Sequence, residues 1–280
     1  WHASRIPNPN YKRLLPPNPG QIDMRVFIVS PLRHHRLQLI LMSGVAGLAY
    51  CFLLPIVGAQ VALLTVLLWI VHPTCCQTVT WISGQGYLTS AFFLFLGLNV
   101  ASIVAPWLSA WTWEQQGLAL AGYGLLQWLA FRCQFTAIAA VVILTYLHLW
   151  PFAAVACLVG LWGSYRTIKE VVTVRRDTFV KQHMGASTKL HWRKLIVIGK
   201  TFYYYTKLAI FPKRLGLYHT FGYHYELPAI EEESWHFWAG MAMLAAMVAA
   251  CFLLPPPVPL GLLWWGAFLS FVLNWITVHQ

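Results

Sequence analysis

The stretch GYLTSAFFLFLGLNVASIVAPWL, residues 86–108, decides the class of fold. It carries no charged side chain, and it is long enough for the roughly 20 apolar residues that cross the roughly 30 Å hydrocarbon core as an α-helix. Trp107, Trp111 and Trp113 crowd its end, and tryptophan is enriched where a membrane helix meets water. The stretch therefore predicts a membrane-spanning helix.

The composition of the whole chain agrees with this prediction. Of 280 residues, 59% are hydrophobic and only 10% are charged, and the mean hydropathy is +0.60. Soluble domains carry roughly 25% charged residues, so a soluble enzyme of this size is excluded, as are a disordered chain and a small disulfide scaffold. The six cysteines show no CxxC or Cys/His spacing typical of zinc, and we predict no metal site.

Further apolar runs recur along the chain. They cover residues 37–54, 58–71, 117–131, 135–150, 151–165, 195–211, 235–254 and 260–278. Pro55 is expected to end the first run, and Pro151 predicts either a tight turn or a kinked helix. We expect an all-α, polytopic membrane bundle of about seven or eight transmembrane helices, without a soluble domain.

Polar residues gather in a few segments. Residues 1–36 are polar, basic and proline-rich and are expected at the membrane interface, whereas residues 37–280 form the transmembrane domain, with a polar loop over 166–194. The chain starts at Trp1 and ends in an apolar run, so we expect the protein to continue beyond both ends. The net charge of +11 fits basic loops that contact anionic membrane lipids. Nucleic acid is excluded as a partner because no soluble basic domain is predicted.

Two basic clusters stand where helices enter the interface. Arg33 and Arg36 precede the first apolar run, and Lys213 and Arg214 follow Pro212. A planar guanidinium can hold a phosphate at two points, and the interface is where a lipid-linked phosphate lies. We expect the two clusters to approach one another at one membrane face, near His72.

Three blocks of sequence, in order, carry a family resemblance. The first is WIVHPTCCQTVTWISGQ at residues 69–85. The second, residues 201–218, is a tyrosine-rich run that contains Tyr205, Pro212 and Tyr218, and the third covers residues 260–280. Together they resemble integral-membrane glycosyltransferases of the GT-C class, and most of all the O-mannosyltransferase-like branch that often carries tetratricopeptide repeats.

The resemblance implies a GT-C-like fold and a sugar donor carried on a polyprenyl phosphate; no other cofactor is expected. In such enzymes an acidic residue of the first non-cytoplasmic loop is the base, and basic residues hold the lipid phosphate. Here the base would be Asp23 or an acid upstream of the chain. The phosphate would contact Arg33, Arg36, Lys213 and Arg214, and the substrate pocket would contain His72, Gln77, Gln85, Tyr205 and Tyr218.

The sequence departs from the family pattern at charged positions. Gln77 stands where the family has glutamate, Gln85 where it has arginine, and Cys133-Gln134 where a Lys-Glu pair is expected. A neutral amide cannot act as a general base. Two hypotheses remain: a divergent glycosyltransferase, or a non-catalytic GT-C-like subunit of a larger membrane complex that contacts lipids, pigments or other membrane subunits. A secondary transporter ranks last because few charges lie at mid-membrane. We predict that the chain alone does not transfer sugar.

Overall fold

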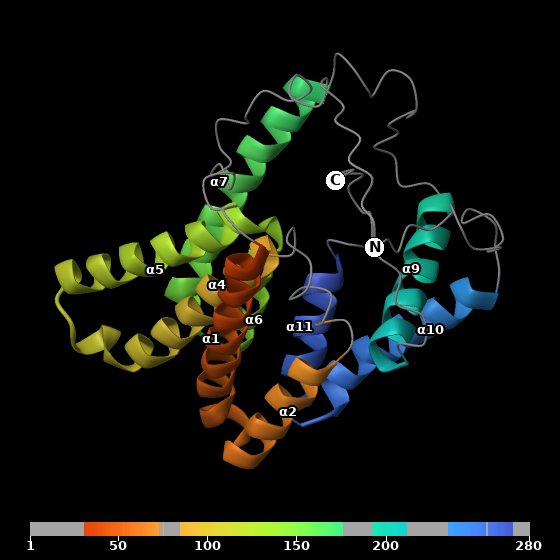
Figure 1. Ribbon diagram of the computed structural model, residues 1–280, viewed down its shortest axis with the longest axis horizontal. Helices are drawn as coiled ribbons and strands as arrows, with labels where there is room; N and C mark the ends of the chain where they lie inside the picture. The colour runs from red at the N-terminus through yellow and green to blue at the C-terminus, as the bar shows by residue number, and fades with distance from the viewer. Residues whose placement is uncertain are drawn as a thin grey trace.

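The computed structural model describes residues 31–72, 75, 85–175, 192–211, 235–255 and 257–270. All of its elements are helical and none of the described residues forms a strand, so the predicted all-α class is confirmed for this part of the chain (Figure 1). The elements are α1 (Pro31–Val57), α2 (Ala59–Val71), α4 (Gln85–Val104), η4 (Ala105–Ala110), α5 (Trp113–Cys133), η5 (Phe135–Ala139), α6 (Ala140–Tyr146), α7 (Trp150–Arg175), α9 (Trp192–Ile210), α10 (Trp235–Leu253) and α11 (Val258–Ser270).

Three stretches of described helix are long and apolar enough to cross a bilayer. They are His35–Val57 in α1, Gln85–Ala110 in α4 and η4, and Trp235–Leu253 in α10. Shorter apolar helices cover Ala59–Val71, Ala137–Tyr146 and Val258–Ala267. These lengths and compositions are consistent with a membrane protein. The larger number of spans and the GT-C-like arrangement stay predictions.

Helices α1 and α2 form an antiparallel hairpin. Pro55 does not end α1 as expected: the helix continues to Val57, and Gly58 makes the turn with φ 81°. The Gly58 N–H donates to the Leu54 carbonyl at 3.1 Å, which pairs a carbonyl at the helix end. A positive φ is accessible to glycine without strain, so Gly58 and not the proline fixes where the hairpin turns.

The main core lies among α1, α4, α5, α6 and α7. Tyr123 of α5 and Phe152 of α7 meet edge to face inside it, with ring centroids 5.1 Å apart. Trp264 of α11 stacks on Phe95 of α4 at 5.2 Å and lies 6.4 Å from Phe52 of α1. The beginning of the third sequence block therefore packs against the predicted apolar runs 37–54 and 86–108.

Polar side chains inside this core are paired with backbone carbonyls. Gln127 donates from Nε2 to the Ala137 carbonyl at 2.8 Å, and Ser90 donates from Oγ to the Ala130 carbonyl at 3.0 Å. Both side chains are buried, so these bonds remove the cost of desolvating them. They also link α5 to η5 and to α4.

The connections around α5 and α7 follow local sequence signals. Thr112 and Gln115 form a capping box that starts α5. Between α6 and α7 the chain turns through His148, whose φ is 58°, and Pro151 sits in the first turn of α7, where its missing N–H costs no hydrogen bond. The alternative of a tight turn is therefore the correct one. Helix α7 runs on to Arg175, so the start of the expected polar loop 166–194 is helical.

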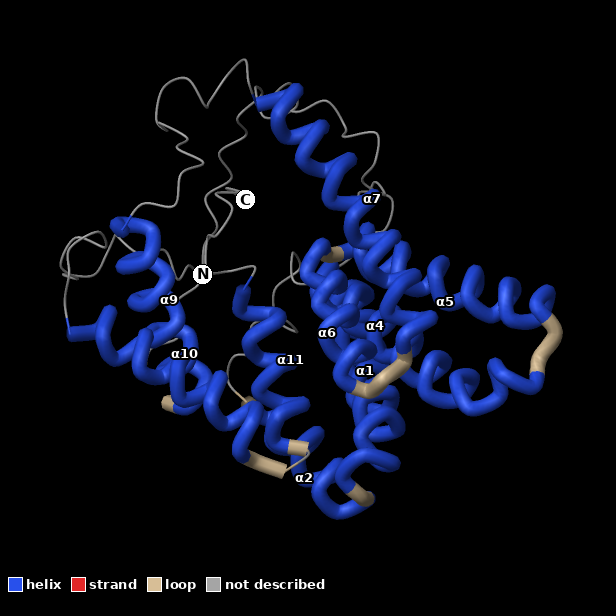
Figure 2. Tube along the Cα trace, turned by 180° about the vertical axis from the view of Figure 1, so that it is seen from behind, coloured by secondary structure: helices blue, strands red, loops and turns tan. Residues whose placement is uncertain are grey.

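Helices α9, α10 and α11 form a second packing unit beside the main core. Ile198 and Phe202 of α9 pack against Met243 and Met247 of α10. Helix α11 then lies between α10 and α6. Figures 1 and 2 show α9 and α10 on one side of the structure and the α4–α5 hairpin projecting on the other, with α1 and α11 between them.

Candidate functional site

The end of α2 meets the end of α9 at one hydrogen bond. His72 follows the last residue of α2 and adopts an extended conformation. Its Nε2–H donates to the carbonyl oxygen of Ala209, in the last turn of α9, at 2.8 Å. Carbonyls in the last turn have no partner within the helix, so an outside donor is favourable there. This bond joins the first and second sequence blocks.

Tyr205 lies one helical turn before Ala209 and on the same side of α9. It is partly buried, and its ring meets the ring of Tyr204 edge to face at 5.8 Å. Burial raises the pKa of the Tyr205 phenol, and the neighbouring phenols of Tyr204 and Tyr87 raise it further. The phenol therefore stays neutral and able to donate a hydrogen bond. Because Tyr87 belongs to the first turn of α4, that turn approaches α9 as well.

Gln85 is the first residue of α4, at the same end of that helix as Tyr87. Its backbone carbonyl accepts from the Thr89 hydroxyl at 2.9 Å. Its side-chain Oε1 is buried and accepts no hydrogen bond from any described residue. An unpaired buried acceptor costs about 1–3 kcal/mol, so this oxygen is a place for an incoming donor. The cation that the family resemblance expects is thus replaced by an acceptor.

The N-terminal basic cluster lies on the same side of the α1–α2 turn as His72. At 1.5 Å rise per residue, Arg36 stands about 30 Å from Gly58 along α1 and His72 about 20 Å along α2. Arg36 is exposed, and Arg33 lies one turn further along α1. Both arginines are therefore at the same end of the hairpin as His72, but they lie farther from the turn than His72 does.

Other predicted site residues lie outside the described part of the chain. These are Asp23, Gln77, Lys213, Arg214 and Tyr218. Phe211 is the last described residue before Lys213, and its N–H donates to the Lys207 carbonyl at 2.7 Å, which closes the end of α9. The expected meeting of the two basic clusters stays a prediction.

Gln134, the third position where the resemblance expects a charge, ends α5. It adopts an extended conformation, its N–H donates to the Ala130 carbonyl at 2.9 Å, and its own carbonyl accepts from the Ala137 N–H at 3.1 Å. These are backbone roles that need no charged side chain. Gln134 therefore joins α5 to η5.

Carboxylates are scarce in the described ranges. Only Glu114, in the first turn of α5, and Glu170, within α7, occur there, and no group of three His, Cys, Asp or Glu in those ranges could hold a metal ion. The described part of the site thus contains a histidine, phenols and an amide. Such groups can hydrogen-bond a ligand, but they provide no carboxylate base.

Two contributors to the site were not predicted from the sequence. One is Tyr87, whose only signal is its place two residues after Gln85 in the first block. The other is the carbonyl of Ala209, which has no side-chain signal at all. Comparison of the chain with protein-family models, with curated proteins and with solved structures gives no match.

Proposed function

We propose that this chain is a multi-pass, GT-C-like membrane protein that binds a polyprenyl-linked phosphate at the α2–α9 junction and does not itself transfer sugar. The observation that carries the proposal is the hydrogen bond from His72 to the Ala209 carbonyl. It brings together two blocks that lie far apart in the sequence, and the basic pair Lys213 and Arg214 belongs to the second of them.

The chemistry of the junction favours an anionic ligand. The net charge of the chain is +11, and the described residues around the junction contribute no carboxylate. Lys213 and Arg214 lie just past the end of α9 in the sequence, where a lipid phosphate at the interface is within reach of a cation. Tyr205 adds a neutral phenol that can donate to a phosphate or sugar oxygen.

The packing of the third block supports a GT-C-like scaffold. Trp264 stacks on Phe95, so α11 rests on α4, whose first turn carries Gln85 and Tyr87. All three resembling blocks thus border α4 or the helices next to it. A single scaffold that places the three blocks around one site explains this proximity better than three unrelated sequence similarities would.

A binding experiment tests the proposal. The purified full-length protein, in nanodiscs, is titrated with a fluorescent polyprenyl phosphate, and inorganic phosphate serves as a competitor for the head group. The double variant Lys213→Ala, Arg214→Ala should weaken binding at least tenfold, because each charge-assisted hydrogen bond contributes about 1.5–3 kcal/mol.

A matched variant controls for the loss of charge alone. Arg166 is an exposed cation on α7 that lies over the Trp162 ring at 5.3 Å, away from the junction. Arg166→Ala should leave the affinity within about twofold of that of the unaltered protein. Equal affinities for the double variant and for Arg166→Ala would refute a phosphate site after α9.

A further inference from the structure

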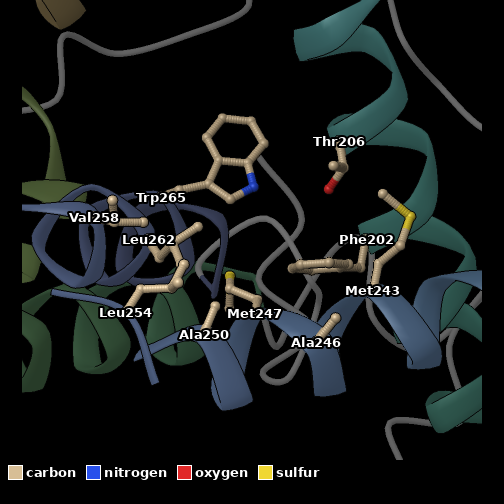
Figure 3. A pocket seen from close by; sticks show the side chains of 10 residues that line it. All are labelled: Phe202, Thr206, Met243, Ala246, Met247, Ala250, Leu254, Val258, Leu262 and Trp265. Carbon is tan, nitrogen blue, oxygen red and sulfur yellow. The ribbon is translucent and has the colours of Figure 1, made fainter. Parts of the chain in front are cut away.

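An open groove runs between α9, α10 and α11, and α11 separates it from the main core (Figure 3). Its volume is about 410 Å³, which falls in the range of about 300–1,000 Å³ typical of small-molecule sites. The walls are almost entirely apolar, and Met243, Met247 and Ala250 of α10 line one side. Methionine side chains adapt their shape to flexible ligands, so this wall suits a hydrocarbon chain.

Two hydrogen-bond donors interrupt the apolar wall. The Thr206 hydroxyl is buried and has no hydrogen-bond partner among the described residues. Figure 3 shows the side chains of Thr206 and Trp265 on opposite sides of the groove, one from α9 and one from α11. A threonine on a helix has two common χ1 rotamers, so a rotation brings its oxygen to the groove surface. One acceptor between the two side chains would pair both donors.

The helices around the groove indicate whether it opens toward lipid or toward water. Helix α10 is a candidate membrane span, and only 11% of its apolar window is buried within the protein. The groove therefore opens where α10 faces hydrocarbon rather than water. Thr206 lies in the last turns of α9 and is followed by the exposed Lys207, whose ammonium lies 5.8 Å from the centre of the Tyr203 ring and provides a cation near this part of the groove.

We propose that this groove binds one acyl chain of a bilayer glycerophospholipid, with its ester carbonyl accepting hydrogen bonds from Thr206 and Trp265 and its phosphate near Lys207. The ester separates this ligand from a polyprenyl phosphate, whose chain carries no acceptor below the phosphate and would leave both donors unpaired. The site is thus distinct from the phosphate site proposed beside His72, and each can be tested while the other fails.

Photolabelling tests the proposal. The full-length protein is reconstituted in vesicles with phosphatidylglycerol that carries a diazirine on its acyl chain, and the adducts are mapped by mass spectrometry. Adducts are expected on α10 around Met243 and Met247. Ala250→Trp fills the groove and should lower this labelling at least fivefold. Ala249→Trp, an equal change at the exposed neighbouring position, should leave it within about twofold.

A second variant removes the donor without filling space. Thr206→Val keeps the shape of the side chain and should lower the occupancy about fivefold, as expected for one lost hydrogen bond, whereas Thr206→Ser should restore it. The two Thr206 variants test the hydrogen bond to the lipid ester even if Ala250→Trp alters the elution profile or helix content of the protein.

Three outcomes would overturn the proposal. The first is equal labelling of Ala250→Trp and Ala249→Trp. The second is no labelling of the groove in the unaltered protein, which would mean that another segment or a second copy of the chain covers it. The third is a photoreactive polyprenyl phosphate that displaces the phospholipid from these positions.

Discussion

Gly199 of α9 and Gly240 of α10 face each other backbone to backbone where the two helices cross. A Cβ on Gly240 would overlap the backbone of Gly199, and a Cβ on Gly199 would fall 2.7 Å from Cδ2 and 3.1 Å from the carbonyl oxygen of Phe237. Small residues allow this approach, which is a main source of packing energy between helices in lipid. Because α9 carries both Ala209 and Thr206, the crossing sets the position of both proposed sites.

Gly240→Ala should therefore destabilise the protein. The added methyl group has backbone on its far side and not a side chain that can rotate away, so we expect a loss of about 1–3 kcal/mol, the usual cost of overpacking. The measurement is the midpoint of thermal unfolding of the purified protein in detergent. Gly47→Ala is the control, because no atom lies within 4 Å of a Cβ at that position of α1. Equal midpoints for the two variants would contradict a close crossing.

The sequence was sufficient to predict the helical class but not the ends of the helices. Apolar runs predict which segments enter lipid, yet α1 passes Pro55 and α7 continues ten residues past Tyr165. A proline near a helix end removes only one hydrogen bond, and polar residues can continue a helix beyond an apolar core. The glycine that ends α1 is recognised only from its positive φ. Boundaries thus depend on backbone geometry that hydropathy does not report.

The candidate site was predicted as sequence blocks and not as contacts. His72 and Tyr205 were selected from a family resemblance, whereas the bond from His72 to Ala209 involves a backbone carbonyl that any residue provides. The crossing at Gly199 and Gly240 was missed for a similar reason, since a glycine in an apolar run looks the same whether it is exposed or packed. Both depend on which helices meet, and a single sequence does not contain that information.

Gln127→Leu should destabilise the main core. Leucine fills a similar volume but cannot donate to the Ala137 carbonyl, which Gln127 pairs at 2.8 Å, and Tyr123 loses a neighbouring acceptor at 3.5 Å. The unpaired carbonyl should cost about 1–3 kcal/mol, seen as a lower thermal midpoint. The exposed Gln60 provides the control, because Gln60→Leu adds apolar surface on α2 without breaking a core bond. A midpoint for Gln127→Leu that matches this control would show that the buried bond contributes nothing.

Cys133 should react slowly with alkylating reagents near neutral pH. Burial raises the pKa of its thiol, and the neighbouring Arg132 guanidinium opposes that effect. Only the thiolate is nucleophilic. The rate of labelling by iodoacetamide should therefore rise over a pH range that lies above the range for an exposed thiol. The measurement uses a variant whose other five cysteines are serine.

Arg132→Gln should slow this labelling further at any given pH, because removal of the cation leaves the burial effect unopposed and raises the thiol pKa again. Arg166→Gln, which removes an exposed cation from α7, should leave the labelling rate unchanged. Faster labelling in Arg132→Gln would mean that the arginine shields the thiol sterically and that its charge has no influence.

The final prediction is that this chain does not transfer sugar on its own. Transfer needs a carboxylate that takes the acceptor proton and a cationic group that stabilises the departing phosphate. Gln77, Gln85 and Gln134 stand where the resemblance expects charges. The structure describes two of them: Gln134 joins two helices through its backbone, and Gln85 presents a buried amide oxygen. A neutral amide serves neither as base nor as cation, although it can still hydrogen-bond a bound lipid.

The decisive assay supplies the purified protein in liposomes with a polyprenyl-phosphate sugar and an acceptor, and measures product over many hours. We expect no turnover while the affinity for polyprenyl phosphate is retained, since binding depends on cations and donors that the chain keeps. Asp23→Asn is the matched test of the remaining acid, and it should change nothing. Turnover that this single substitution abolishes would establish Asp23 as a catalytic base and the chain as an active glycosyltransferase. Turnover that survives it would place the base on another acid of this chain and would equally refute the prediction.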